Sequence, residues 1–256
     1  MRKRHSIHPL LVLFTVLLIG CGGHPVHGPH NGPAHGHGHA HHGHGHAGRH
    51  HSQNDAKRFN DAEKWAKRFE NPKRDLWQKP RAVLTAMALA PSHRVVDVGS
   101  ATGYFTVRLA RAVPQGRVWG FDVAPGMVRY LTARAHREKL PNLTSHLAGK
   151  EPPQLPQPVD RIFLCNTYHH IADRVRYFGA LRLRLRPGGR LVIVDFKAGK
   201  LPVGPPPSHR VLPPQIHREL TRAGYRRISL DQSTLPYQFI AIYGDAERAR
   251  PDSKNQ

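Results

Sequence analysis

A glycine-containing turn and two acidic residues, each at the end of a strand-like run, could together bind a ligand. The segment Asp97–Gly103 reads DVGSATG and overlaps the end of the β-branched run Arg94–Val98. Glycine lets a backbone turn sharply and approach a ligand closely, and ligands bind at the carboxyl ends of strands in open α/β sheets. Asp122 lies nineteen residues past Gly103, at the end of the next strand-like run. A carboxylate there can accept both hydroxyls of a ribose, so the pattern predicts a ribose-containing ligand.

A second group of residues could move a proton. Asn166 and Thr167 are followed by Tyr168, His169 and His170, directly after an apolar run. Imidazole titrates near neutral pH, so either histidine could serve as a general base, which is worth roughly 10²–10⁴-fold in rate. Tyr168 is a third catalytic candidate, while Asn166 could contact a cofactor or orient a substrate. The alternative is that these residues only cap and pack beneath the following helix.

Three further residues could contact a substrate. Asp195 ends a later strand-like run, and its alternative role is to cap that strand. His209 and Arg210 follow the stiff segment Gly204–Pro207. They could meet an anionic substrate, although an ordinary surface loop fits the same sequence equally well.

Alternating strand-like and helix-like periods position these residues, from about Lys57 to Tyr243. Apolar residues at spacings of three and four predict a helix over 59–69, and another helix follows Pro80. The predicted strands are Arg94–Val98, Arg117–Phe121, Leu143–Leu147, Val159–Cys165, Arg190–Asp195, Tyr225–Leu230 and Tyr237–Tyr243. The predicted helices between them are Tyr104–Ala112, Gly126–Glu138, Ala172–Leu185 and Pro214–Ala223. This order favours a mostly parallel sheet with helices on both faces, in which the last two strands, lacking a helix between them, form an antiparallel pair.

Four segments resemble motifs of the class I S-adenosylmethionine-dependent methyltransferases, in the right order over roughly residues 75–243. The segment VVDVGSATG at 95–103 resembles the first motif of that family, and FDVAPGMV at 121–128 resembles its second-strand motif. Segments 160–166 and 185–191 resemble its fourth-strand and fifth-strand regions. The resemblance implies a Rossmann-like α/β fold with a seven-stranded, mostly parallel sheet whose last strand is antiparallel. It also implies S-adenosyl-L-methionine as the cofactor and methyl transfer as the activity.

The resemblance further implies a set of cofactor-binding residues. They are Asp97, Gly99, Ser100, Ala101, Gly103, Asp122, Val123, Met127 and Asn166. Within this set Asp122 would hold the ribose, and Val123 or Met127 would flank the adenine. Two departures from the family pattern would weaken cofactor binding. Ala101 replaces the middle glycine of the usual turn, and the sequence after the third strand, around Gly149, lacks the usual acidic residue unless Glu151 reaches back.

The first twenty residues have the pattern of an export signal. A basic start precedes the apolar run 10–19, which is shorter than the roughly 20 residues that span a bilayer comfortably. The end of this run, at 18–21, resembles the lipobox of bacterial lipoproteins. That resemblance implies a lipid on Cys21 and a membrane-anchored protein of the bacterial cell envelope. The alternative is an uncleaved anchor with an incidental cysteine, and the protein would be cytoplasmic if the signal is not used.

Residues 24–51 hold twelve of the 21 histidines, mostly alternating with glycine. The candidate metal ligands among them are His35, His37, His39, His41, His42, His44 and His46. Imidazole binds Zn²⁺ and Ni²⁺, so this tract could buffer metal or add a pH-dependent charge. It could equally be a solvated linker, and no fixed ligand spacing predicts a defined coordination site.

The chain therefore divides into four predicted parts. These are a signal peptide at 1–20, a disordered His/Gly-rich tether at 21–54, a methyltransferase domain at 55–245 and a disordered polar tail at 246–256. The formal net charge is +22, and residues 57–256 alone hold 35 Lys and Arg against 16 Asp and Glu. A basic domain held near anionic lipid is expected to rest against the membrane surface.

Three functions remain open from the sequence. The leading hypothesis is a membrane-tethered methyltransferase that acts on a small-molecule acceptor. The second is a metal-binding envelope lipoprotein whose methyltransferase domain is degenerate. The third is an RNA methyltransferase, which the basic charge favours and the lack of an evident RNA-binding module disfavours.

Overall fold

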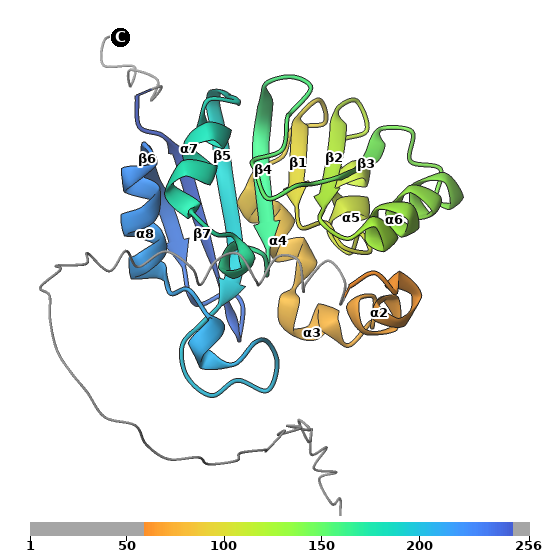
Figure 1. Cartoon of the computed structure of the whole chain (residues 1–256), viewed down its shortest axis with the longest axis horizontal. Helices are drawn as coiled ribbons and strands as arrows, with labels where there is room; N and C mark the ends of the chain where they lie inside the picture. The colour runs from red at the N-terminus through yellow and green to blue at the C-terminus, as the bar shows by residue number, and fades with distance from the viewer. Residues whose placement is uncertain (1–58, 248–256) are drawn as a thin grey trace, which may run out of the picture. The chain divides into compact units, whose positions relative to one another are not determined.

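The computed structural model describes residues 59–247, and these form a seven-stranded sheet flanked by helices (Figure 1). The strand order is β3-β2-β1-β4-β5-β7-β6. The first five strands along this order are mutually parallel, and β7 is antiparallel to both of its neighbours. The predicted Rossmann-like fold, with its antiparallel pair at the chain's end, is confirmed.

The strand bounds agree closely with the sequence prediction. They are β1 Arg94–Val98, β2 Arg117–Asp122, β3 Leu143–Leu147, β4 Val159–Cys165, β5 Leu185–Phe196, β6 Tyr225–Asp231 and β7 Gln238–Asp245. The central strands are buried on both faces, as expected of parallel strands covered by crossover helices. The main difference is β5, which begins five residues before the predicted Arg190 because Leu185 already pairs with Val159.

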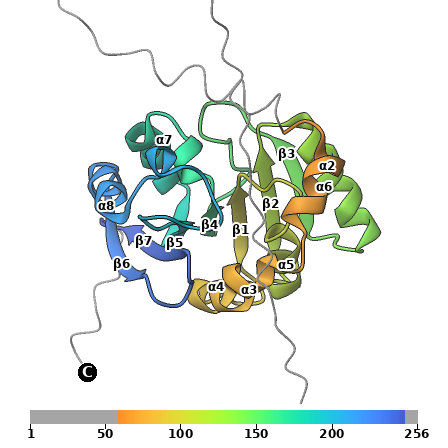
Figure 2. The same cartoon turned by 90° about the horizontal axis from the view of Figure 1, so that it is seen from below.

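The helices cover both faces of this sheet. They are α2 Ala62–Phe69, α3 Arg74–Gln78, α4 Pro80–Met87, α5 Thr106–Ala112, α6 Pro125–Arg137, α7 Arg174–Arg182 and α8 Pro213–Arg222, with short 3₁₀ turns η1 Tyr168–His170 and η2 Pro207–His209. Side chains of α7 and α8 form one core with the sheet, and those of α4, α5 and α6 form a second core with its other face. Figure 2 shows the sheet between these two layers.

The N-terminal helices are held by buried polar contacts as well as by packing. Arg161 on β4 is 6% exposed and donates from Nε to the carbonyl of Met87 at 2.7 Å and from Nη2 to that of Ala88 at 2.9 Å. These carbonyls end α4, where a cationic donor is favourable.

The sequence did not predict α3, a single short turn between the predicted helices. No helix within residues 59–247 is long and apolar enough to cross a membrane.

Candidate active site

The predicted site residues meet at one edge of the sheet, because parallel strands end on the same side. Asp97 and Asp122 stand at the ends of β1 and β2, Asn166 directly follows β4, and Asp195 precedes the last residue of β5. Figure 2 looks toward this edge, which α2 and α3 flank. The topology therefore brings together residues that are up to about a hundred positions apart in the chain.

The glycine turn, residues 99–103, adopts the left-handed backbone that its sequence predicts. Gly99 has φ 78° and Gly103 has φ 94°. The N–H groups of Gly99 and Ser100 both donate to the carbonyl of Phe121, at 2.8 and 3.0 Å, which fixes the turn against β2. A Cβ on Gly99 would lie 2.6 Å from Cγ2 of Thr167, so the turn also touches the segment after β4. Only glycine fits this close approach.

Gly99→Ala is expected to disrupt the turn. The new methyl group meets Thr167 and the residue retains a positive φ, so we expect a loss of about 2–4 kcal/mol in unfolding free energy and weaker cofactor binding. Gly199→Ala is the matched control, since Gly199 has φ 88° but a Cβ there would meet nothing within 4 Å. Urea unfolding of both variants separates the collision from the backbone strain. Equal losses in the two variants would contradict the close approach.

Ala101 keeps the conformation of the glycine that it replaces. Its φ is 46°, a region that costs an L-residue roughly 1–2 kcal/mol. Its N–H donates to Oδ2 of Asp122 at 2.9 Å, so this strained residue links the turn to the acid at the end of β2. The substitution therefore preserves the path of the turn.

Asp122 accepts two backbone hydrogen bonds and retains further acceptor capacity. Oδ2 accepts from Ala101, and Oδ1 accepts from the N–H of Ala124 at 2.9 Å. Burial raises the pKa of this carboxyl, and the backbone donors oppose the rise. A carboxylate offers about four lone-pair sites, so each oxygen can still accept a hydroxyl. This geometry suits the ribose role that the resemblance implies.

Asp97 is more deeply buried and is held by one hydroxyl. Thr106 Oγ1 donates to its Oδ2 at 2.6 Å, and only 3% of the residue is exposed. Burial raises its pKa to about 7, and the nearby Asp122 contributes to the rise. A cation bound at this edge would favour the ionised form. In the neighbouring turn, the buried Ser100 Oγ lies against Gly120 and has no hydrogen-bond partner among the described residues.

The helix α2 packs over the turns that follow β1 and β2. Met127 is 1% exposed and lies in a small apolar cluster with Ala62 and Ala124, while Val123 is partly exposed. Asn60 Oδ1 accepts from the N–H of Gly126 at 2.9 Å. Met127 is thus covered by α2, and the partly exposed Val123 is the more accessible of the two predicted adenine neighbours.

Glu70 ties the end of α2 to the site. It accepts from Oγ1 of Thr102 at 2.6 Å and pairs with Nη1 of Arg134 at 2.7 Å. Neither Glu70 nor Asn60 was predicted, because no local pattern in the sequence marks these long-range contacts. Glu151, which the sequence left as a possible adenine contact, instead pairs with Arg176, its Oε1 accepting from Nη2 at 3.0 Å.

Asn166 ends a chain of buried amides. It has φ 58°, and its Oδ1 accepts from Nε2 of Gln238 at the start of β7. The Oε1 of Gln238 accepts from Nε2 of Gln78 on α3 at 2.6 Å, and both glutamines are fully buried. Arg74 Nε donates to Gln78 Oε1 at 2.6 Å. The position of Asn166 is thus fixed by α3 and β7, a connection that the sequence did not predict.

His169 and Asp195 form a buried pair. The Nδ1 of His169 lies 3.1 Å from both carboxylate oxygens of Asp195, and their side chains are 5% and 1% exposed. Asp195 Oδ1 also accepts from the N–H of Phe196 at 2.8 Å, which fixes the carboxylate. The sequence named both residues as site candidates but not as partners. They meet because β4 and β5 are neighbours in the sheet.

The other two catalytic candidates occupy different surroundings. The hydroxyl of Tyr168 is buried and donates to Oε2 of Glu219 on α8 at 2.7 Å, and burial and this glutamate raise its pKa far above the usual range. His170 is exposed, and its ring centre lies 4.2 Å from that of His169. The structure therefore places His169 with Asp195, and it places Tyr168 in a contact between η1 and α8.

The loop after β5 is held by Arg210. Its Nε donates to the carbonyl of Pro205 at 2.8 Å, and its Nη1 donates to the carbonyls of Lys197 and Gly199 at 3.0 and 2.7 Å. This guanidinium thus organises the loop. His209 is exposed at the end of η2.

Cys21 and the candidate ligands of the histidine tract lie outside the described residues. Within residues 59–247, no group of three or more His, Cys, Asp or Glu side chains is placed to hold a metal ion.

Comparisons with known proteins agree with this geometry. Residues 95–189 match the family described as "Methyltransferase domain". The chain is 32% identical over 163 residues to a protein-L-isoaspartate O-methyltransferase of Anaeromyxobacter dehalogenans, covering 61% of this chain and 66% of that one. It is 30% identical to a demethylmenaquinone methyltransferase of Thermus thermophilus, covering 48% and 55% of the two chains. The alignments with these and other curated relatives span between about a third and two thirds of the relatives' lengths.

A solved structure covers more of the fold. A methyltransferase of Aquifex aeolicus, described as dependent on S-adenosylmethionine (SAM), superposes with a TM-score of 0.65 at 26% identity, over 72% of this chain and 97% of its own. The chain thus carries a methyltransferase domain with the class I fold. Its fold and its matched residues are those of the SAM-dependent methyltransferases to which it is similar.

The residues at the carboxyl edge fit S-adenosyl-L-methionine. Asp122 has acceptor capacity for ribose hydroxyls, and the buried carboxyl of Asp97 at the same edge would suit the cationic part of the cofactor. The buried Ser100 Oγ, which lacks a partner among the described residues, lies in the glycine turn.

Proposed function

We propose that the chain transfers a methyl group from S-adenosyl-L-methionine to a small-molecule acceptor whose nucleophile must lose a proton. The observation that carries this proposal is the buried pair of His169 and Asp195, beside the glycine turn at the same edge of the sheet. A histidine whose Nδ1 faces a fixed carboxylate is arranged as a general base, because its Nε2 then accepts protons.

Each residue has a distinct part in the reaction. When bound, the cofactor supplies an electrophilic methyl group on a sulfonium sulfur. Asp122 would hold the ribose, and the backbone of the glycine turn would line the site. Asp195 keeps the imidazole of His169 in the tautomer with a proton on Nδ1, so that Nε2 takes the proton of the acceptor. The carboxylate then stabilises the imidazolium that forms. Tyr168, which is bound to Glu219, takes no part.

An aromatic group at the same edge of the sheet favours an apolar, flat acceptor. Trp77 on α3 lies with its ring centre 6.2 Å from those of Phe196 and Tyr237. Phe196 adjoins Asp195, and Tyr237 adjoins Gln238. The relative named a demethylmenaquinone methyltransferase supports a quinone-like acceptor, whereas the protein-L-isoaspartate relative shows that acceptors vary within the group.

The membrane location is a proposal from the sequence. The lipobox-like segment supports a lipid on Cys21, and the tether 21–54 would connect it to the domain in the cell envelope. A Cys21→Ala variant is expected to leave the membrane fraction, and its retention there would contradict the anchor.

The histidine tract would buffer Zn²⁺ or Ni²⁺. Deletion of residues 24–51 is expected to lower the affinity of the chain for Zn²⁺, and an unchanged affinity would dismiss that role.

A labelled-methyl assay tests the proposed activity. The full chain is incubated with S-adenosylmethionine carrying a tritiated methyl group and with separate organic-solvent, protein and RNA fractions of cell envelope and cytoplasm. Label in the organic-solvent fraction supports the small-molecule acceptor. Label confined to RNA supports the RNA alternative instead. Cofactor binding with no label in any fraction supports the degenerate domain.

A further inference from the structure

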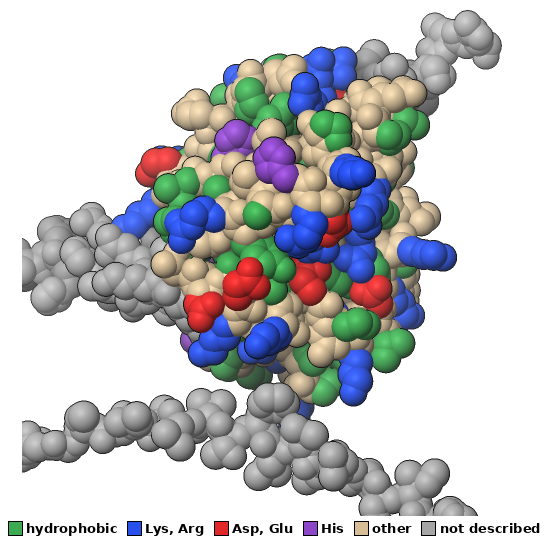
Figure 3. Space-filling view, turned by 90° about the vertical axis from the view of Figure 1, so that its right-hand side faces the viewer, with side chains coloured by type: hydrophobic (Ala, Val, Ile, Leu, Met, Phe, Trp, Pro, Cys, Tyr) green, Lys and Arg blue, Asp and Glu red, His purple; other side chains and the backbone are tan. Residues whose placement is uncertain are grey.

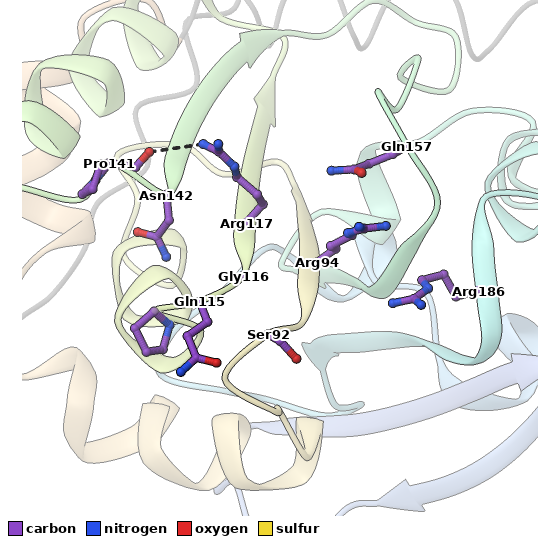
Figure 4. A pocket seen from close by; sticks show the side chains of 10 residues that line it. Ser92, Arg94, Gln115, Gly116, Arg117, Pro141, Asn142, Gln157 and Arg186 are labelled. Carbon is purple, nitrogen blue, oxygen red and sulfur yellow. Dashed lines mark hydrogen bonds between the residues drawn. The ribbon is translucent and has the colours of Figure 1, made fainter.

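A polar pocket opens at the opposite edge of the sheet, where the strands begin. It has a volume of about 680 Å³, and none of its ten lining residues is acidic. Three of them are arginines: Arg94 at the start of β1, Arg117 at the start of β2 and Arg186 near the start of β5. Figure 4 shows the side chains of Arg94, Arg186 and Gln157 extending toward the same space, while that of Arg117 turns toward Pro141.

Two of these arginines are direct neighbours in the sheet. Arg94 and Arg117 are register partners on adjacent parallel strands. Like charges in that relation repel each other and destabilise a sheet. The guanidinium of Arg94 has no hydrogen-bond partner within residues 59–247, and that of Arg117 makes one long contact, 3.4 Å to the carbonyl of Pro141. Neither guanidinium therefore pairs with a carboxylate of residues 59–247.

Among the described residues, Asp160 is the carboxylate that contacts two of these arginines. Asp160 accepts from the backbone N–H of Arg94 at 2.8 Å and pairs with Nη1 of Arg186 at 3.1 Å. One negative charge against three guanidinium groups leaves the pocket strongly positive. The pKa of His93, between two lining residues, is lowered first by burial and then by Arg161, while Asp160 raises it and Arg186 and Arg190 lower it. In contrast, on the side of the domain in Figure 3, Lys and Arg side chains lie among acidic ones.

We infer that this pocket binds a phosphate group. The planar guanidinium fork matches phosphate oxygens in pairs, and arginines from separate strands can approach one phosphate from different sides. A phosphodiester lipid headgroup and a soluble phosphate share this chemistry. Strand β1 separates the pocket from the carboxyl edge by roughly 16 Å, at about 3.3 Å per residue. Occupation of the pocket thus leaves the methyl-transfer site open.

Two binding measurements on the full chain test the pocket. The first is calorimetry with inorganic phosphate at low ionic strength. The second is sedimentation with vesicles of phosphatidylcholine containing phosphatidylglycerol. The test variant is Arg94→Gln with Arg117→Gln, and the matched control is Arg129→Gln with Arg218→Gln, two exposed arginines on α6 and α8. Both variants lose the same net charge. The test variant is expected to remain folded, because it removes a repulsion.

The expected result is at least a tenfold loss of phosphate affinity in the test variant and less than twofold in the control. If the ligand is a lipid headgroup, vesicle binding also falls at least tenfold in the test variant alone. If the ligand is soluble, vesicle binding falls equally in both variants while the phosphate affinities still differ. Equal behaviour of the two variants in both measurements, or no phosphate binding by the unchanged chain together with equal vesicle binding, overturns the proposal.

Discussion

Asp122→Ala is expected to weaken S-adenosylmethionine binding by about 10²–10⁴-fold. The variant lacks the carboxylate that would accept two hydrogen bonds from the ribose hydroxyls, and each such bond is worth roughly 1.5–3 kcal/mol when one partner is charged. It would also release the N–H groups of Ala101 and Ala124, which shape the two turns beside the cofactor. Titration calorimetry with the cofactor measures this loss directly.

Asp231→Ala is the matched control for that experiment. Asp231 also ends a strand and accepts backbone hydrogen bonds, from Ser233 at 2.8 Å and Thr234 at 3.0 Å. It lies on β6, at the far edge of the sheet from β2 and β3. This variant is expected to bind the cofactor as the unchanged protein does. An Asp122→Ala protein that is folded and binds within threefold of the unchanged chain would remove the ribose role.

His169→Ala is expected to lower kcat by about 10²–10⁴-fold, the usual contribution of a general base. Cofactor affinity is expected to stay within a few-fold, since the imidazole faces Asp195 and not the glycine turn. Steady-state kinetics on the acceptor found in the labelled-methyl assay, with cofactor titration, measure both effects.

Two further variants separate a chemical role from a structural one. Asp195→Asn is expected to give a smaller loss of kcat than His169→Ala, because the base remains but its tautomer is no longer fixed. His170→Ala, which removes the neighbouring exposed imidazole, is expected to retain most of the activity. A large loss in His170→Ala with normal turnover in His169→Ala would move the base to His170.

Local patterns predicted the parts of the site that a single strand and turn provide. The local structure around Asp97–Gly103 is predictable from its own sequence, because glycines occupy positions with positive φ angles and β-branched residues form the strand before them. Even at Ala101 the turn keeps its path, since the N–H bond to Asp122 and the neighbouring glycines hold it. The mostly parallel sheet, with an antiparallel pair at the end of the chain, followed from the repeated alternation of strands and helices.

Contacts between distant elements could not be read from the sequence. Gln78 meets Gln238 across 160 positions, and Glu70 reaches Thr102 across 32. No periodicity marks such pairs, because each depends on how whole helices pack. His169 and Asp195 illustrate the intermediate case. Both were recognisable as polar residues at strand ends, but their partnership required β4 and β5 to be neighbours.

Direct titration of the full chain with S-adenosyl-L-methionine tests the central claim most simply. The methyltransferase fold, the glycine turn and the Asp122 carboxylate, which would hold the ribose, all predict this ligand. The prediction is binding at one site per chain with a dissociation constant in the micromolar range (about −8 kcal/mol at 1 μM), largely lost in Asp122→Ala. A folded, unchanged chain that shows no binding at millimolar cofactor would contradict the account.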